Sequence, residues 1–305
     1  MGHRRFILFT GILGAALAAA GPAAAASSPA ATPQHSGQTV QKYDYYLALG
    51  DSLGAGWQPN PVTGVGAITK QGYAADIDTD LNRDDPSLQY VNLACPGETT
   101  TTMLDGGCPY PESYSSQEAA AEAFLAAHRS SHILVTIDIG ANNIDGCLTS
   151  TGIDTTCITD GIEAAATDLP QILGGLEAAG GPNTAIYGMN YYDPFLAEWL
   201  TGSAGQTLAT ESVQLSGEFN SVLSSVYAAF HIPVANVSGA FNTTEFTPLV
   251  PLAPGVTVPL NVATVCEWTW MCAPAPVGPN IHANAAGYRQ IADAFDQVID
   301  PSRHR

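Results

Sequence analysis

The chain has 305 residues, of which 12% are charged, and its net charge is −19 at pH 7. This acidic balance argues against nucleic acid and anionic membrane surfaces as partners, because both bind proteins through Lys and Arg side chains. The length suits a single α/β domain preceded by a short leader.

The first residues have the composition of a secretory signal peptide. Arg4 and Arg5 precede an apolar run over residues 6–20, and small residues continue to Ala26. We therefore expect residues 1–26 to be cleaved during Sec or twin-arginine export, which makes the protein secreted. The apolar run is short for a spanning helix, so we expect no stable membrane insertion.

Three further segments follow the predicted signal peptide. Residues 27–42 are rich in Ser, Pro, Ala, Thr and Gln and are expected to form a disordered lead-in. Residues 43–300 then form the folded domain, and residues 301–305 form a short tail.

The first predicted strand ends in a candidate nucleophile. Residues 45–49 are an apolar run of strand length, followed by Gly50-Asp51-Ser52 and small residues that can open a helix. A serine on such a turn exposes its hydroxyl beside backbone N–H groups, as acyl transfer requires. The G-x-S-x-G elbow of α/β-hydrolases has the same pattern, but there several strands precede the serine.

Strand-like and helix-like segments alternate along the rest of the chain. Strands are predicted over residues 88–94, 132–139, 184–190 and 232–237, and helices over residues 73–81, 116–129, 159–179, 205–230 and 283–299. Residues 241–272 are expected to be apolar and rich in loops. The alternation predicts a five-stranded parallel sheet between two helical layers, a three-layer α/β/α sandwich.

Polar residues follow the first three strands at the points where they end. Ser52, Gly97 and Asn142 each lie just past a different strand. Because the carboxyl ends of parallel strands share one edge of a sheet, we expect these residues to lie together there.

A base for Ser52 is expected from the loop before the last helix, which carries His282. The other histidines fall in terminal segments or at element ends away from this edge: His3, His35, His128, His132, His231 and His304.

All six cysteines lie after the predicted signal peptide, which favours disulfides in an exported chain. Six cysteines allow 15 connectivities. The close spacing favours the sequential pairs Cys95 with Cys108, Cys147 with Cys157, and Cys266 with Cys272. No metal site is expected, because no C-x-x-C pair occurs and no histidine lies at ligand spacing.

The chain resembles the SGNH, or GDSL-type, hydrolase family from about residue 45 to residue 299. Four ordered segments carry the resemblance: residues 50–53 (Gly-Asp-Ser-Leu), 92–97 (Asn-Leu-Ala-Cys-Pro-Gly), 140–143 (Gly-Ala-Asn-Asn) and 281–288 (Ile-His-Ala-Asn-Ala-Ala-Gly-Tyr). The resemblance implies a flavodoxin-like sheet. With the leader and the cysteine pairs, the chain is most similar to the secreted bacterial esterase and lipase branch.

The family pattern also implies a role for each matching residue. Ser52 would be the nucleophile and His282 the general base. The Ser52 and Gly97 N–H groups and the Asn142 side-chain amide would form the oxyanion hole. The implied enzyme is a carboxylic-ester hydrolase that needs no cofactor and acts on small-molecule or lipid esters, and we expect a monomer.

Two positions depart from the family pattern. Asn143 replaces an Asp in the third segment, a change that we expect to be tolerated. Pro279 stands three residues before His282, where an acid usually orients the histidine. The expectation is a Ser–His dyad in which the backbone carbonyl of Pro279, or less favourably that of Asn280, accepts the Nδ1 proton.

Alternative functions remain on the same fold. Aromatic and apolar residues at 191–200 and 241–270 favour an acyl chain in the cleft, but a carbohydrate deacetylase or a phospholipase would present similar residues. The missing acid would also fit a secreted binding protein that has lost catalysis. No G-x-G-x-x-G follows a strand, which excludes a dinucleotide-binding sheet.

Overall fold

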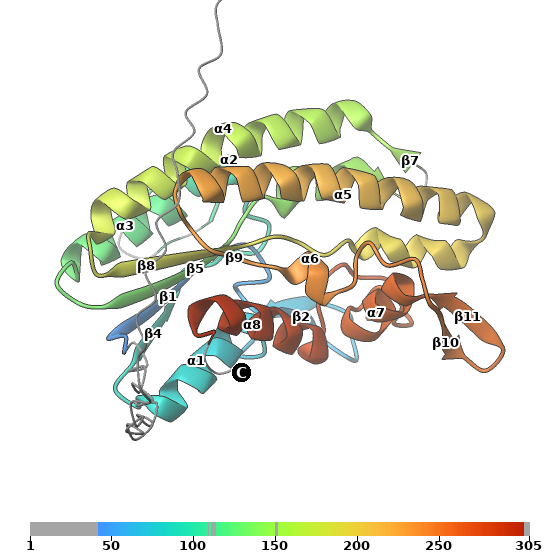
Figure 1. Cartoon of the computed structure of the whole chain (residues 1–305), viewed down its shortest axis with the longest axis horizontal. Helices are drawn as coiled ribbons and strands as arrows, with labels where there is room; N and C mark the ends of the chain where they lie inside the picture. Colours follow the sequence, from blue (N-terminus) through green and yellow to red (C-terminus); the bar gives the residue numbers. More distant parts are fainter. Residues whose placement is uncertain (1–41, 109, 111–113, 150–151, 302–305) are drawn as a thin grey trace, which may run out of the picture. The chain divides into compact units, whose positions relative to one another are not determined.

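A computed structural model describes residues 42–108, 110, 114–149 and 152–301 (Figure 1). The predicted signal peptide, residues 27–41 of the predicted lead-in and the tail beyond residue 301 lie outside the described residues.

The centre of the domain is a five-stranded sheet in which all strands are parallel. Its strands, in the order in which they pair, are β4 (Gln89–Asn92), β1 (Tyr45–Gly50), β5 (Ile133–Asp138), β8 (Thr184–Met189) and β9 (Val234–Ala235). The predicted sheet is confirmed, although β9 is shorter than its predicted span of residues 232–237.

The middle strands are buried on both faces, which explains their nearly continuous apolar composition. All six residues of β5 are buried. In β1, Leu47 pairs with Val91 of β4 on one side and with Val135 of β5 on the other. This register sets the carboxyl ends of β1, β4 and β5 along one edge of the sheet.

Helices cover both faces of the sheet (Figure 1). One layer contains α2 (Thr100–Asp105), α3 (Gln117–Ala127), α4 (Thr155–Gly180) and α5 (Ser203–Ala229). The other contains α1 (Tyr73–Asp84), α6 (Val237–Ala240), α7 (Leu260–Trp268) and α8 (Ala285–Ile299). Together with the sheet, these layers form the predicted three-layer sandwich.

Short elements connect the layers. They are the hairpins β2–β3 (Trp57–Pro59 and Gly66–Ile68), β6–β7 (Leu148–Thr149 and Gly152–Ile153) and β10–β11 (Leu249–Ala253 and Val256–Pro259), and the 3₁₀ helices η2 (Ala141–Asn143), η3 (Asp145–Cys147) and η4 (Pro194–Thr201). The segment 241–272 is therefore more regular than expected. The sequence did not predict α7 and the β10–β11 hairpin because the segment contains four prolines, and proline normally argues against strands and helix interiors.

The cysteines form the three predicted pairs: Cys95 with Cys108, Cys147 with Cys157, and Cys266 with Cys272. Among the described helices, none combines the length and the apolar character needed to cross a bilayer.

Candidate active site

The turn after β1 presents Ser52. Gly50 has φ = +129°, and a Cβ at this position would collide with the backbone carbonyl of Asp138 on β5. Glycine meets both constraints. Asp51 Oδ1 accepts a hydrogen bond from the Leu53 N–H at 2.9 Å, which fixes the next part of the turn. Ser52 is 8% exposed and lines a pocket at this edge of the sheet.

His282 reaches Ser52 from the segment before α8. Its Nε2 lies 2.8 Å from Ser52 Oγ. The Asn284 side chain caps α8 by accepting hydrogen bonds from two N–H groups of the first turn. The His282 carbonyl accepts a hydrogen bond from the Trp270 N–H at 3.0 Å. The backbone on both sides of the imidazole is therefore fixed.

The second imidazole nitrogen meets the Asn280 side chain. His282 Nδ1 lies 2.8 Å from Asn280 Oδ1, and the same oxygen accepts the His282 backbone N–H at 3.1 Å. The His282 backbone N–H is a donor in either tautomer, so the Asn280 atom that faces it is the oxygen, and Nδ1 must donate to that oxygen. Nδ1 then carries the proton, and the lone pair of Nε2 points to Ser52. This differs from the expectation for Pro279, because the acceptor is a side chain one residue further on.

An indole ring packs against the face of the imidazole. The ring centroids of Trp57 and His282 are 4.1 Å apart with an interplanar angle of 25°. The backbone N–H of Trp57 donates to the Ser52 carbonyl at 3.0 Å, and the backbone carbonyl of Trp57 accepts from the Tyr288 hydroxyl at 2.9 Å. Gly66 on β3 leaves space for the indole, since a Cβ there would overlap the ring.

Burial lowers the pKa of His282 to about 4. Removing the ring from water disfavours its charged form. Among the described residues, no carboxylate hydrogen-bonds to the imidazole to oppose this effect. The ring is therefore neutral at pH 7 and free to accept a proton at Nε2.

The predicted oxyanion donors gather beside Ser52. The Cys95 N–H donates to the Gly50 carbonyl at 3.0 Å, which brings the segment after β4 to the turn after β1. Gly97 has φ = +85°, and no atom lies within 4 Å of where its Cβ would be. Within the described part of the chain, neither the Ser52 N–H nor the Gly97 N–H donates to another protein group. Both remain available for an anion.

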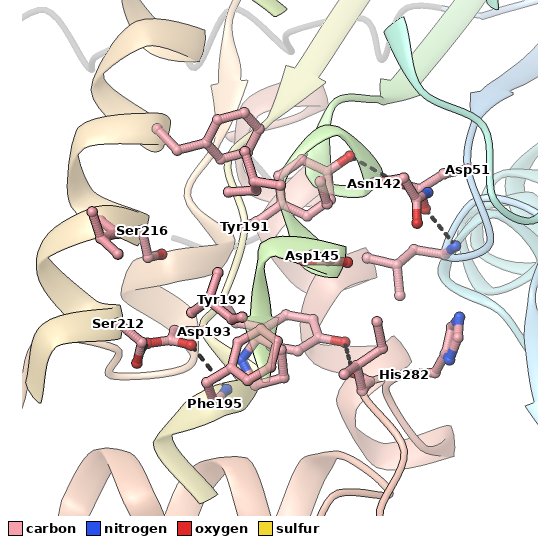
Figure 2. Close-up of a pocket in the computed structure, with 18 of the residues that line it drawn as sticks. Asp51, Asn142, Asp145, Tyr191, Tyr192, Asp193, Phe195, Ser212, Ser216 and His282 are labelled. Carbon is pink, nitrogen blue, oxygen red and sulfur yellow. Dashed lines mark hydrogen bonds between the residues drawn. The ribbon is translucent and has the colours of Figure 1, made fainter. Parts of the chain in front are cut away.

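Asn142 and Asn143 connect η2 to the same segment. Asn142 Nδ2 donates to the Glu98 carbonyl at 2.9 Å, and its amide lines the pocket (Figure 2). Asn143 Oδ1 accepts the Thr100 N–H at 3.0 Å, and Asn143 Nδ2 donates to Thr100 Oγ1 at 2.8 Å. Asn143 thus holds the start of α2.

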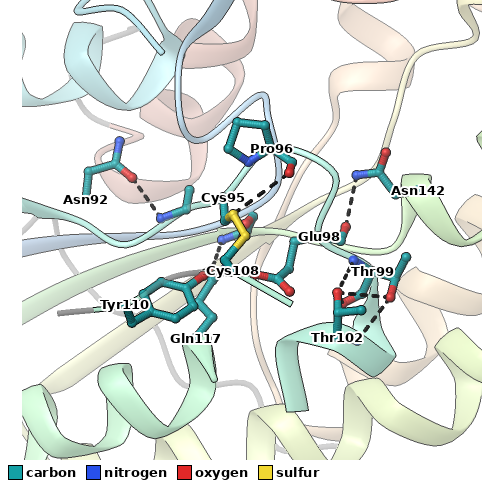
Figure 3. Close-up of a disulfide and its surroundings, with 12 residues drawn as sticks. Asn92, Cys95, Pro96, Glu98, Thr99, Thr102, Cys108, Tyr110, Gln117 and Asn142 are labelled. Atoms are coloured by element: carbon teal, nitrogen blue, oxygen red, sulfur yellow. Dashed lines mark hydrogen bonds between the residues drawn. A yellow bond between two sulfur atoms is a disulfide. The ribbon is translucent and has the colours of Figure 1, made fainter. Parts of the chain in front are cut away.

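Gln117 is a supporting residue that the sequence analysis missed. It is fully buried, its Oε1 accepts the Gly50 N–H at 2.6 Å, and its Nε2 donates to the Gly50 carbonyl at 2.9 Å. Nε2 also lies 3.0 Å from Glu98 Oε2, which accepts from the Tyr110 hydroxyl too (Figure 3). Gln117 joins the turn of Ser52 to the segment of Gly97. The sequence gives no signal for this role, because it shows Gln117 only as a glutamine at the start of a helix.

Two buried carboxyls lie behind Ser52. Asp138 Oδ1 accepts the Tyr73 hydroxyl at 2.6 Å, and Asp138 Oδ2 accepts the Gly54 N–H at 3.0 Å. Asp51 Oδ2 accepts the Tyr191 hydroxyl at 3.1 Å. Burial raises the pKa of Asp51 and of Asp138, and the nearby Asp51 charge raises that of Asp138 further. Asp138 could have been singled out from the sequence, because it is an acid inside the mainly apolar strand β5.

The pocket beside Ser52 has apolar walls and acidic groups (Figure 2). Its volume is ≈ 60 Å³. Eleven apolar or aromatic residues line it: Leu53, Ala141, Ile144, Leu148, Tyr191, Tyr192, Pro194, Phe195, Leu215, Phe219 and Ile281. Its acidic lining residues are three aspartates: Asp51, Asp145 and Asp193. Burial raises the pKa of Asp145 to about 8 and that of Asp193 to about 6.

Cys95, Glu98 and Cys108 lie close enough together to suggest a metal site. The two sulfurs form a disulfide (Figure 3). A disulfide offers no thiolate to a metal ion, so this cluster does not fit one.

The three-layer fold with a serine and a histidine paired at the carboxyl edge of its sheet defines a hydrolase-type architecture. The chain belongs to the GDSL-like lipase/acylhydrolase family, whose profile matches residues 48–290. This confirms the family predicted from the four sequence segments and points to a hydrolase that acts on esters. No curated protein sequence matches the chain.

Solved structures share the fold at low sequence identity. A putative GDSL-like lipase from Parabacteroides merdae has 16% identity and a TM-score of 0.53, over 85% of this chain and 97% of that one. An acetylxylan esterase from Geobacillus stearothermophilus has 15% identity and a TM-score of 0.51, over 86% and 96%. An extracellular lipase from Streptomyces rimosus has 18% identity and a TM-score of 0.51, over 83% and 98%.

Proposed function

We propose that the protein is a secreted serine esterase that hydrolyses esters of short-chain carboxylic acids. The observation that carries the proposal is the 2.8 Å contact between Ser52 Oγ and His282 Nε2. This contact lies at the mouth of an apolar pocket, in a chain of the GDSL-like family.

In the first half-reaction, Ser52 Oγ attacks the ester carbonyl carbon while His282 Nε2 takes the hydroxyl proton. The Ser52 N–H, the Gly97 N–H and the Asn142 amide donate hydrogen bonds to the developing oxyanion. The tetrahedral intermediate collapses, the bond to the leaving oxygen breaks, and His282 passes its proton to that oxygen. An alcohol departs and the acyl group stays on Ser52.

In the second half-reaction, a water molecule attacks the acyl carbon and gives a proton to His282 Nε2. The same three donors stabilise the second oxyanion. The bond to Ser52 Oγ then breaks, the oxygen recovers its proton from His282, and a carboxylic acid leaves.

The pocket volume supports a short acyl group. A water molecule needs about 10–15 Å³ of such volume, so ≈ 60 Å³ holds an acyl tail of about five non-hydrogen atoms. A long fatty acyl chain would need the surrounding side chains to move.

Deacetylation of a carbohydrate is a second candidate. An acetyl group fits the small pocket, and the rings of Tyr191, Tyr192 and Phe195 could pack against a sugar face. Acetate release from acetylated xylan, compared with hydrolysis of p-nitrophenyl acetate, distinguishes a glycan substrate from a simple ester.

Secretion is supported by the three disulfides, which persist in oxidising compartments, and by the predicted signal peptide. Expression of the full chain with and without residues 1–26, followed by assay of the culture medium, tests it.

The direct test is hydrolysis of p-nitrophenyl esters from acetate to palmitate. We expect turnover to be highest for the shortest acyl groups, and Ser52→Ala or His282→Ala to lower kcat by roughly 10⁴-fold or more. Ser225→Ala on α5 and His132→Ala at the opposite edge of the sheet are matched controls, and both should retain activity. A wild-type protein that hydrolyses none of these esters, and no acetylated glycan, would refute the proposal.

A further inference from the structure

Within residues 42–301 as described, no carboxylate bonds to the His282 ring, although this ring must become an imidazolium when it takes the Ser52 proton. Among the described residues, the titratable groups that line the same pocket or lie on α7 and α8 near it are Asp51, Asp145, Tyr191, Tyr192, Asp193, Glu267 and Tyr288. Among the described contacts, none of them hydrogen-bonds to the imidazole. In the described part of the chain, the hydrogen-bond partners of the ring nitrogens are Ser52 Oγ and Asn280 Oδ1.

Asn280 is held firmly enough to set the ring orientation. Its Oδ1 accepts both the ring Nδ1–H and the His282 backbone N–H, so the amide is fixed to the residue that it orients. The Asn280 N–H donates to the Trp270 carbonyl at 3.2 Å. Trp270 lies within the loop closed by Cys266 and Cys272. The amide oxygen is neutral, so it selects a tautomer without adding a charge.

Trp57 supplies an electron-rich face to the same ring. The rings are stacked at 4.1 Å, and the indole is confined between the imidazole and the backbone of Gly66. An indole face attracts a cation within about 6 Å of its centroid. The attraction exists only when the imidazole is protonated, which is the state formed in the transition state.

We propose that Asn280 and Trp57 together replace the carboxylate that usually accompanies a catalytic histidine. Asn280 positions the neutral ring with its Nε2 lone pair toward Ser52, and the Trp57 indole stabilises the imidazolium. Both act through His282 and are positioning residues. The inference rests on the proposed function, because it assigns how the base of that reaction is supported.

One consequence is activity in acid. A carboxylate partner raises the pKa of a histidine, whereas burial beside a neutral amide leaves the pKa of His282 at about 4. The free base therefore persists well below pH 6. A carboxylate at position 280 should remove this property.

The first experiment measures kcat/KM for p-nitrophenyl acetate between about pH 3 and pH 9 in the wild type, Asn280→Asp and Asn280→Ala. In Asn280→Asp, we expect the acidic limb to move up by about one pH unit or more. In Asn280→Ala, we expect kcat to fall by about 10²-fold without that movement. An unmoved limb in Asn280→Asp, or a kcat within threefold of wild type in Asn280→Ala, would overturn the role of Asn280.

The second experiment tests the indole face. Fluorinated tryptophans incorporated at position 57 keep the ring shape and weaken its negative face, so log kcat should fall with each added fluorine. Trp199, which packs against Phe246, is the matched control position. Trp57→Leu should lower kcat by about tenfold with KM unchanged, and Trp57→Phe by less. An equal kcat for tryptophan and its tetrafluoro analogue would refute the role of Trp57.

Nitrogen NMR of the imidazole separates this inference from the proposed function, because it needs no substrate. We expect the Nδ1-protonated tautomer in the wild type and a higher ring pKa in Asn280→Asp. These results would support the positioning role even if no ester were hydrolysed. A mixed tautomer in the wild type would contradict it even in an active enzyme.

Discussion

Asn142 and Asn143 are adjacent and chemically identical, yet their amides have different partners. Asn142 faces the pocket and donates to the Glu98 carbonyl, whereas Asn143 joins η2 to Thr100 at the start of α2. An aspartate at 143 would keep the oxygen that accepts the Thr100 N–H and would place a negative charge near a helix N-terminus, where it is favourable. An aspartate at 142 would lose the side-chain N–H groups that are proposed to donate to the oxyanion.

The two Asn→Asp variants should therefore differ strongly in kcat. For Asn142→Asp, we expect kcat to fall by about 10²–10³-fold, as for the loss of one oxyanion donor. For Asn143→Asp, we expect kcat to stay within about threefold of wild type, because the oxygen that accepts the Thr100 N–H is kept. Kinetics on p-nitrophenyl acetate check both, and similar losses in the two variants would contradict the division of tasks.

Short-range patterns in the sequence predicted Ser52, Gly97, Asn142 and His282 as site residues, since each follows or precedes a predictable element. The partners of His282 were less accessible. Trp57 lies on a hairpin that the sequence analysis did not predict, and its contact with His282 depends on the tertiary fold. For Asn280 the sequence predicts at most a contact through the backbone carbonyl, because the reach of its side chain depends on the local loop conformation.

At the scale of elements, the disulfides share one property: each lies beside a different part of the site. Cys95–Cys108 closes the loop that carries Gly97, and Cys147–Cys157 joins η3, at the pocket wall, to α4. Cys266–Cys272 encloses Trp270, which binds the backbone around Asn280 and His282. Within the described chain, none of the three joins two strands of the central sheet.

Removing the first two disulfides should therefore give different kinetic results. Their sequence separations of 13 and 10 residues predict similar stability losses, about 3 kcal/mol each. We expect Cys95→Ala with Cys108→Ala to lower kcat by about tenfold, because the Gly97 donor is loosened. Cys147→Ala with Cys157→Ala should mainly change KM and the acyl-length preference.

Thermal melting combined with the ester series checks this expectation. Equal effects of the two double variants on kcat would show that the disulfides contribute stability alone.

The regular elements were predicted well where their patterns were long. The predicted helix over residues 205–230 corresponds to α5, Ser203–Ala229, and the strand over residues 132–139 to β5, Ile133–Asp138. The observed helix boundaries differ from the predicted ones where a capping side chain sets the helix start, as Asp154 does for α4. The short hairpins were missed because two- to five-residue strands have too few positions to show an alternation.

At the scale of the whole molecule, carboxyl groups are in excess, and some of them lie in the interior as well as on the surface. The net charge is −19, and several inward carboxyls have raised pKa values: Asp51, Asp138, Asp145 and Asp193. Such groups hold protons in the folded state that the unfolded chain releases. Their contribution to stability is fully present below the ordinary pKa of about 4 and is lost as the pH rises through the folded pKa.

We therefore expect the melting temperature to be highest in mild acid and to decline from about pH 5 to pH 8. Asp145→Asn should reduce this decline, because the pKa of Asp145 is raised to about 8 and the amide has no proton to lose. The variant should melt roughly 5 °C higher than wild type at pH 8 and at a similar temperature at pH 4. Calorimetry across this range checks it, with the exposed Glu211→Gln as a control of equal charge change. A decline equal to that of wild type would contradict the assignment.

An ester hydrolase endangers the acylated metabolites and lipids of the cell that makes it. The sheet of this protein can form from its own hydrogen bonds and apolar packing, but the loops that carry Gly97 and His282 are completed by oxidation of their cysteines. In a reducing cytosol the newly made chain would lack these disulfides, and its kcat would be lowered as expected for the loss of Cys95–Cys108. If the chain is exported as proposed, full activity would follow oxidation of its thiols, so the cysteines would time the enzyme as well as stabilise it.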